Sequence, residues 1–157
     1  MQSFDSVLLV TAVYLVIDAL TGHVRMANAG HPLPLRLPAG GGPTQVLTDP
    51  KPGPPLGLVE APHYANYELQ LHPGDRAVVF TDGVYELEGK HGGSFGQSKL
   101  RQTLETHASL ESEAFLDAVL TTVREHSHDQ TFSDDACLLS IGYRREQNQR
   151  VVRMTVG

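Results

Sequence analysis

The chain has 157 residues, a length that fits a single globular domain with a buried core. Hydrophobic residues make up 40% and charged residues 19%, which predicts a folded rather than a disordered chain. The formal net charge of −6 argues against nucleic-acid binding and against attachment to an anionic membrane surface, because both need dense Lys and Arg. The single cysteine, Cys137, excludes an internal disulfide and suits a reducing cytoplasm, where we expect the protein.

The longest apolar run, Val7 to Ile17, is shorter than the roughly 18–20 residues that cross a bilayer, and it lacks the features of a signal peptide. It is rich in β-branched residues without a helical period, which predicts a strand buried on both faces. The turn Asp18–Gly22, in which Gly22 favours a positive φ, leads to an alternating strand at His23–Asn28. Together these segments predict a β-hairpin.

Prolines and glycines between residues 32 and 57 predict loops with short edge strands, because proline has no N–H to donate to a neighbouring strand. Further on, strict alternation followed by a His-Pro-Gly-Asp turn predicts a second hairpin, whose returning strand lies inside a sheet. The strands predicted in these two regions are, in chain order, Leu33–Leu37, Gln45–Thr48, Asn66–Leu71 and Ala77–Phe80.

Two amphipathic helices are predicted next, over Gln97–His107 and Glu111–His126. Acidic residues in the first turn of the second helix and basic residues in its last turn complement the helix dipole. A buried strand at Ala136–Ile141 completes the predicted core. The apolar stripes of the two helices consist of Leu100 and Leu104 in the first, and Phe115, Leu116, Val119, Leu120 and Val123 in the second.

The order of elements, strands followed by helices and a final strand, predicts an α+β layered architecture rather than an alternating βαβ one. We expect one domain over residues 1–143, followed by a C-terminal tail over residues 144–157. Two interpretations of the tail stay open: a frayed extension, or an additional strand at Val151–Val156.

Acidic residues flank two predicted core strands at the points where these strands meet solvent. Asp82-Gly83 follows one strand directly, and Asp134-Asp135 precedes the last one. If the strands are neighbours, the carboxylates converge at one end of the sheet as hard oxygen ligands for Mg²⁺ or Mn²⁺. Gly83 then lets the backbone approach a metal or substrate closely. The alternative interpretation is structural, because Asp-Gly is a common turn signal and an acidic pair can simply face solvent.

Several short motifs follow one another from about Val7 to about Ile141, which is nearly the whole chain. They are, in chain order, Asn28-Ala29-Gly30-His31-Pro32, Pro55-Leu56-Gly57-Leu58, Gly74-Asp75-Arg76-Ala77-Val78-Val79-Phe80-Thr81-Asp82-Gly83-Val84-Tyr85-Glu86, Phe95-Gly96 and Ser133-Asp134-Asp135. This combination resembles the SpoIIE/RsbU-type serine phosphatases, the bacterial branch of the PPM (PP2C-like) metal-dependent phosphatases. Each motif alone is weak, whereas the combination in this order is specific.

The resemblance implies a PP2C-like α-β-β-α sandwich of mostly antiparallel strands, with a two-metal centre for Mn²⁺ or Mg²⁺ at one end. It implies removal of phosphate from phosphoserine or phosphothreonine, typically on a STAS-type anti-sigma-factor antagonist in bacterial signalling. In such a site the metals polarise the phosphoryl oxygens and deprotonate a bridging water for in-line attack. An upstream sensor or receiver domain is a further expected partner, whereas nucleic acid and membrane are not.

The family's Asp-Gly metal ligand falls on Asp82 and Gly83, and its C-terminal Asp ligand falls on Asp134. The resemblance therefore implies that Asp82 and Asp134 are the catalytic residues and that Asp135 lies in the outer shell of the metal site. His31, in the Ala-Gly-His-Pro loop, is a candidate for substrate binding. The alternative interpretation of His31 is that it holds this loop in place by a hydrogen bond.

The family pattern opens with a Gly-Asp-x-x-Asp-like strand and a Gly-Asp-Val-x-Gly-His-Gly-like segment, which have no counterpart before Val7. We therefore expect the chain to be the C-terminal part of the domain, without the N-terminal strands and helices and about half of the metal ligands. We expect it to be weakly active or inactive alone. An unpaired strand edge or uncovered apolar patch is expected to favour self-association, such as a homodimer.

Three further groups carry weaker functional interpretations. His126, His128 and Asp129 resemble a ligand cluster, but they follow a helix, where a solvated cap is the alternative. Cys137 stands where the family signature has threonine, and within a predicted strand it is expected to pack in the core, inaccessible as a nucleophile. The segment Gly40–Gly42 predicts a flexible loop, since it lacks the lysine and helix of a phosphate-binding loop.

Three functions stay open at this point. The first is the phosphatase, and the second is a non-catalytic regulatory or docking module with a phosphatase-like scaffold. The third, an unrelated metal-dependent hydrolase, requires additional His or Asp ligands. The upstream coding sequence discriminates the first two, because a Gly-Asp-x-x-Asp strand just before Met1 would indicate an excised enzyme.

Overall fold

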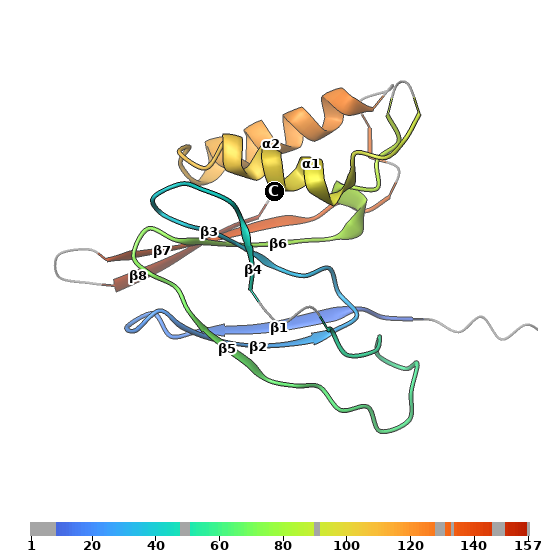
Figure 1. Ribbon diagram of the computed structural model, residues 1–157, viewed down its shortest axis with the longest axis vertical. Coiled ribbons are helices and arrows are strands. Elements are labelled where there is room, and N and C mark those ends of the chain that lie inside the picture. The colour runs from blue at the N-terminus through green and yellow to red at the C-terminus, as the bar shows by residue number, and fades with distance from the viewer. Residues whose placement is uncertain are drawn as a thin grey trace, which may run out of the picture.

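Two antiparallel sheets stack on each other, and two helices cover the outer face of the larger sheet (Figure 1). The computed structural model describes residues 9–47, 51–89, 92–127, 131–132, 134–145 and 150–156. None of the helices in these ranges is long and apolar enough to span a membrane. The arrangement confirms the predicted α+β layered architecture.

The smaller sheet has three strands in the order β1-β2-β5. Their bounds are Ala12–Ile17 for β1, His23–Ala29 for β2 and Tyr67–Gln70 for β5. β1 and β2 form the predicted hairpin, and Gly22 in its turn has the expected positive φ of 76°. The prediction that the first strand is buried on both faces is wrong, because Leu15 and Ile17 pack against a buried apolar cluster, whereas Tyr14, on the opposite face of β1, is 71% exposed. Residues 7 and 8 of that predicted strand lie outside the described residues.

The larger sheet has five strands in the order β4-β3-β6-β7-β8. Their bounds are Leu35–Leu37 for β3, Gln45–Val46 for β4, Arg76–Phe80 for β6, Leu138–Arg145 for β7 and Arg150–Val156 for β8. β6 lies between β3 and β7, as the prediction of an inner strand requires. β8 pairs with β7 over seven residues, so the C-terminal segment forms an additional strand rather than a frayed extension. Thr48, the last residue of one predicted strand, lies outside the described residues.

The second predicted hairpin is wrong. β5 pairs with β2 in the small sheet, whereas β6 pairs with β3 and β7 in the large one. The segment between them therefore carries the chain from one sheet to the other. Alternation of apolar and polar residues predicts that a segment is a strand, but it does not select the strand with which it pairs.

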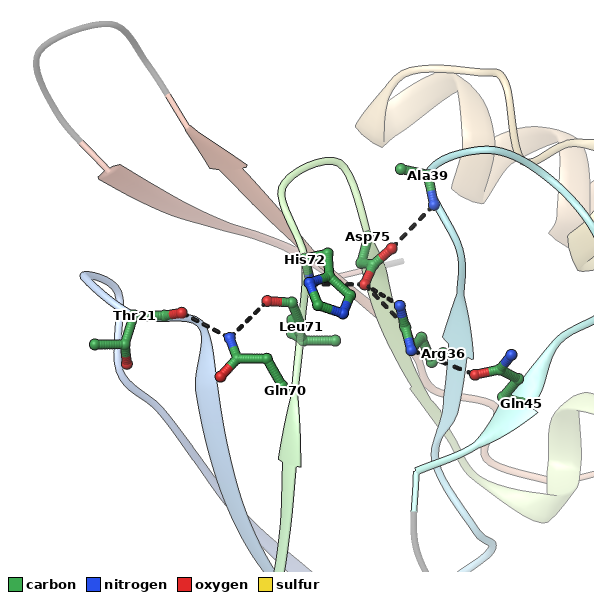
Figure 2. Close-up of polar contacts among 8 residues, drawn as sticks. All are labelled: Thr21, Arg36, Ala39, Gln45, Gln70, Leu71, His72 and Asp75. Atoms are coloured by element: carbon green, nitrogen blue, oxygen red, sulfur yellow. Dashed lines mark hydrogen bonds and ion pairs between the residues drawn. The ribbon is translucent and has the colours of Figure 1, made fainter.

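Asp75 fixes this crossing segment (Figure 2). Its carboxylate is 2% exposed and accepts hydrogen bonds from the Arg36 guanidinium at 2.7 and 2.8 Å. It also accepts from the backbone N–H of His72 at 2.7 Å and of Ala39 at 3.0 Å. Just before the crossing, Gln70 Nε2 donates to the carbonyl oxygen of Thr21 at 2.6 Å, which ties the end of β5 to the first hairpin turn.

The helices are α1, Gly96–Thr106, and α2, Ser112–His126, both within one residue of the predicted bounds. All residues of the two predicted apolar stripes are buried. They pack on the large sheet in a helix-side core of Leu35, Leu37, Val78, Phe80, Val84, Leu87, Phe95, Leu100, Leu104, Phe115, Leu116, Val119, Leu120, Val123 and Leu138. The opposite face of the large sheet contributes to an inter-sheet core of Val24, Leu47, Leu71, Ala77, Ile141 and Tyr143.

Candidate functional site

The two acidic segments meet at one edge of the large sheet. β6 and β7 are antiparallel neighbours with Phe80 opposite Leu138, so the end of β6 and the start of β7 share an edge. Thr81 N–H donates to the carbonyl of Cys137 at 3.0 Å, and Cys137 N–H donates to Thr81 Oγ1 at 2.9 Å. Thr81 Oγ1 in turn donates to the carbonyl of Asp135 at 3.1 Å. Thr81 thus joins the residues before Asp82 to those after Asp134.

Gly83 allows these two segments to approach each other closely. It lies in the short 3₁₀ helix η1, Asp82–Val84, which follows β6. A Cβ atom on Gly83 would lie 2.6 Å from the carbonyl oxygen of Asp135, closer than side chains and backbone can pack. The close approach that was predicted at this glycine is therefore made by the Asp135 backbone.

The three aspartates all reach solvent at this junction. Asp82 accepts a hydrogen bond from the Gly83 N–H at 3.1 Å, and Asp134 accepts one from the Asp135 N–H at 2.7 Å. Carboxylate oxygens are the donors that Mg²⁺ and Mn²⁺ prefer. Among the described residues, however, no group of three or more His, Cys, Asp or Glu side chains is placed to hold an ion. The aspartates fit part of a divalent-cation site, and their role as metal ligands stays a prediction.

A cleft of about 290 Å³ opens beside Asp82. Its walls come from Thr11, just before β1, and the loop after β2 on one side, and from the end of β6 and α1 on the other. Leu35 and Phe80 in its lining belong to the buried cluster beneath the helices, so the cleft opens at the strand ends beside α1 rather than in the space between the two sheets. Its lining consists of Thr11, Gly30, His31, Pro32, Leu33, Leu35, Pro52, Phe80, Asp82, Tyr85, Gln97 and Arg101.

His31 lies in this cleft in a loop that its own contacts hold in place. The buried Asn28 side chain donates to the His31 carbonyl and accepts from the His31 N–H, both at 2.9 Å. The imidazole Nδ1 lies 2.9 Å from the carbonyl oxygen of Pro32. The Asn28 side chain thus holds the loop through the His31 backbone and the ring contacts the next residue, while both interpretations of the ring, loop holding and substrate contact, stay predictions.

Tyr85, Gln97 and Arg101 line the cleft, although no motif in the sequence assigned them to a site. Burial of the Tyr85 phenol raises its pKa above the ordinary value of 10.0, and a hydrogen bond with Gln97 acts in the opposite direction. Gln97 and Arg101 are four residues apart, which places both on one face of α1. That spacing was available from the sequence, but the docking of α1 beside Asp82 was not.

Other predictions from the sequence have mixed outcomes. The prediction of an inaccessible core cysteine is wrong. Cys137 is exposed, because β7 begins at the residue after it, Leu138.

The His126 ring makes an edge contact with Phe95, with ring centroids 5.3 Å apart, and its Nε2 is buried without a hydrogen-bond partner among the described residues. His128 and Asp129, like Ser133, lie outside the described residues, so the predicted ligand cluster is not tested.

Comparison with known families gives a match over most of the chain. Residues 1–144 match the model of the family described as stage II sporulation protein E (SpoIIE). Protein IcfG from Synechocystis is 25% identical over 137 residues, a region that covers 87% of this chain and 21% of IcfG. The chain thus spans about a fifth of this relative's length.

Solved structures with the same fold include phosphatase domains. The SiaA-PP2C domain of Pseudomonas aeruginosa superposes with a TM-score of 0.71 at 24% identity, covering 87% of this chain and 52% of that one. The phosphatase domain of SpoIIE from Bacillus subtilis gives 0.65 at 13% identity, covering 88% of this chain and 60% of that one. The RsbU and RsbW domains of Rv1364c from Mycobacterium tuberculosis give 0.63 at 22% identity, covering 89% and 36%. These likenesses confirm the PP2C-like fold.

Proposed function

The chain belongs to the SpoIIE family, and from this premise we propose that it is part of a metal-dependent protein serine/threonine phosphatase. The proposed substrate is a phosphorylated regulatory protein of bacterial signalling, of the STAS-type anti-sigma-factor antagonist class. An upstream sensor or receiver domain is the proposed regulator of this activity.

One observation carries the proposal. The Asp82 and Asp134 segments, 52 residues apart in the sequence, are fastened to each other through Thr81 and Gly83 beside a solvent-open cleft. A metal-dependent phosphatase needs carboxylates from distant parts of the chain at one end of its sheets, next to space for a phosphoryl group. The junction supplies carboxylates at such a place, and the cleft supplies space of suitable size.

The residues of the chain have distinct proposed roles. Asp82 and Asp134 bind the divalent ion, which, when bound, neutralises charge on the phosphoryl oxygens. Thr81 and Gly83 fix the relative position of the two carboxylates, because their contacts hold together the backbone segments that carry Asp82 and Asp134. His31, held by Asn28 on the opposite wall, contacts the substrate chain that presents the phosphorylated residue.

Calorimetric titration with Mn²⁺ and a chromogenic phosphate-ester assay test this proposal. The chain alone is expected to bind Mn²⁺ weakly and to turn over the ester poorly, because two carboxylates do not neutralise a dinuclear centre. Asp82→Asn and Asp134→Asn are each expected to abolish the Mn²⁺ binding that exists. Asp117→Asn, which removes an exposed carboxylate from α2, is the matched control and should leave binding unchanged.

The outcomes separate two functions. Turnover that Asp82→Asn abolishes would support the enzyme and show that further ligands complete the site. Equal Mn²⁺ binding by the wild type and both junction variants would contradict the proposal. The absence of a three-ligand group among the described residues favours one alternative, a non-catalytic docking module with a phosphatase-like scaffold. Binding of the phosphorylated regulatory protein without any Mn²⁺ dependence would support that alternative.

A further inference from the structure

Helix α1 presents three different faces to its surroundings. Leu100 and Leu104 are fully buried in the helix-side core. Gln97 and Arg101 line the cleft beside Asp82. Lys99 lies on a third face, along a groove between α1 and α2. The cleft face is therefore built from a polar pair at positions i and i+4, separate from the residues that anchor the helix.

Arg101 has no hydrogen-bond or ion-pair partner among the described residues, in contrast to the two paired arginines Arg36 and Arg144. Arg36 is paired with Asp75, and Arg144 is paired with Glu111. The carboxylate one turn after Arg101, Glu105, accepts hydrogen bonds from the backbone N–H and the hydroxyl of Thr44 at 2.6 and 3.0 Å. Those bonds hold Glu105 on the Thr44 side of α1, so the Arg101 guanidinium is left for another partner.

We propose that Arg101 is the phosphoryl-binding residue of this cleft and that it recognises the phosphate of a phosphoserine or phosphothreonine side chain. The proposal rests on the phosphatase function above and names the residue that binds the phosphate in the same site. A guanidinium presents two parallel N–H donors that match two oxygens of a phosphoryl group, and such bidentate bonds are stronger and more directional than those of an ammonium group.

The surroundings of Arg101 suit this role. It is half-buried, so its charge is screened less than that of a freely exposed side chain. Asp82 lies in the same cleft, so a phosphate bound by Arg101 would sit near the proposed cation ligands. Gln97, one turn earlier on the same face, carries an amide that can donate to the same oxygens or to the backbone of the phosphorylated chain.

The test is an NMR titration of the full 157-residue chain with a terminally blocked glycine peptide that carries one phosphoserine, with and without Mg²⁺. The phosphopeptide is expected to shift the amide resonances of Gln97, Arg101 and His31. Arg101→Gln should weaken binding by about tenfold or more, and Arg101→Lys should weaken it less, because the ammonium keeps the charge but loses the bidentate geometry. Lys99→Gln, on the α2 side of the same helix, is the matched control and should bind like the wild type.

Three results would overturn the inference: equal affinity of Arg101→Gln and the wild type, no binding by the wild type, or equal binding of the unphosphorylated peptide. Amide spectra of the variants show whether each is folded, so a loss of fold is not mistaken for a loss of binding. The Mn²⁺ titrations with Asp82→Asn report on the phosphatase proposal separately. Binding of Mn²⁺ through Asp82 without Arg101-dependent phosphopeptide binding would leave the phosphatase proposal standing and remove this one.

Discussion

The helix-side core contains fifteen buried residues, whereas the inter-sheet core contains six, counted over the described parts of the chain. The first is closed by two helices whose apolar stripes lie against the sheet. The second lies against a three-stranded sheet whose edge strand exposes Tyr14. Because apolar burial is the main favourable term in folding, most of the stabilisation should come from the helix side.

The inter-sheet side depends more on polar contacts. The Asp75 carboxylate holds the crossing segment against β3 and the loop that follows it, whereas the Gln70 amide holds the end of β5 against the first hairpin turn (Figure 2). Buried Tyr143 reaches from the large sheet to the carbonyl oxygen of Leu20 in the first hairpin turn, at 3.4 Å. The comparison of the two cores shows that apolar burial beneath the helices provides most of the stabilisation, whereas hydrogen bonds fix the crossing segment and the turns where the two sheets approach each other.

Phe115→Ala should cause the largest loss of stability. Phe115 is fully buried, and the Arg76 guanidinium lies 4.0 Å from its ring centroid. Truncation leaves a cavity in the helix-side core, so we expect the free energy of unfolding to fall by about 3–5 kcal/mol. Tyr14→Ala, on the exposed edge strand, should change it by less than about 0.5 kcal/mol. Urea denaturation of both variants measures the difference, and equal losses would contradict the contrast between core and edge.

Asp75→Asn should be nearly as damaging on the inter-sheet side. The variant keeps the side-chain volume, but it leaves the Arg36 guanidinium without its counter-charge and puts an NH₂ group where a carboxylate oxygen accepts hydrogen bonds. We expect a loss of about 3 kcal/mol, at the low end for a buried pair because Arg36 still reaches solvent. Glu68→Gln, in an exposed pair with His23, is the control and should stay near wild type in chemical denaturation.

Gly83→Ala tests the junction between the two acidic segments. The added methyl group would lie 2.6 Å from the Asp135 carbonyl oxygen, so the backbone must move apart. Forced displacement of this kind costs about 1–3 kcal/mol, and we expect Mn²⁺ binding to weaken along with stability. Gly40→Ala adds a methyl group where no atom lies within 4 Å and should change neither property. Normal Mn²⁺ affinity in a destabilised Gly83→Ala protein would show that the junction does not set the position of the carboxylates.

Alkaline pH should produce the smallest effect. Burial raises the pKa of Tyr85 in the folded chain above its ordinary value of 10.0, so above that pH the unfolded chain loses the phenolic proton more readily. The contribution of Tyr85 to stability is therefore complete below about pH 10 and declines as the pH rises through the unfolded pKa toward the folded one. Tyr85→Phe should lose less stability than the wild type across this range in parallel urea titrations, and identical alkaline losses would contradict the assignment.

The sequence predicts best those structural features that depend on a pattern of nearby residues. The spacing of Leu100 and Leu104, and of the apolar residues of α2, predicted both helices and the faces that they bury. The position of Asp82 after one strand and of Asp134 before another predicts that both segments meet at one edge if the two strands are neighbours, and β6 and β7 are. Helix formation and the face that a helix buries depend on residues close together in the sequence, so the local pattern is sufficient to predict them.

The features that the sequence did not predict depend on partners distant in the chain. Strict alternation in β5 predicted a strand but not its pairing with β2, because the crossing depends on Asp75 finding Arg36, 39 residues away. Tyr14 is exposed because it lies on the face of β1 opposite to Leu15 and Ile17, which pack on the inter-sheet core, and the apolar composition of the strand does not reveal that only one face is covered. Arg101 is a candidate for phosphate binding because α1 lies beside Asp82 in the fold, a contact that the sequence does not predict.

The cleft is lined by segments that flank both sheets: Thr11 precedes β1 and His31 follows β2 of the smaller sheet, whereas Asp82 and Tyr85 follow β6 of the larger one. Any molecule that touches both walls is bound by the assembled pair of sheets and not by either sheet alone. By mass action such a molecule should raise the midpoint of thermal unfolding as its concentration increases. A phosphorylated side chain bound in this cleft would therefore also stabilise the contact between the two sheets, which has the smaller of the two cores.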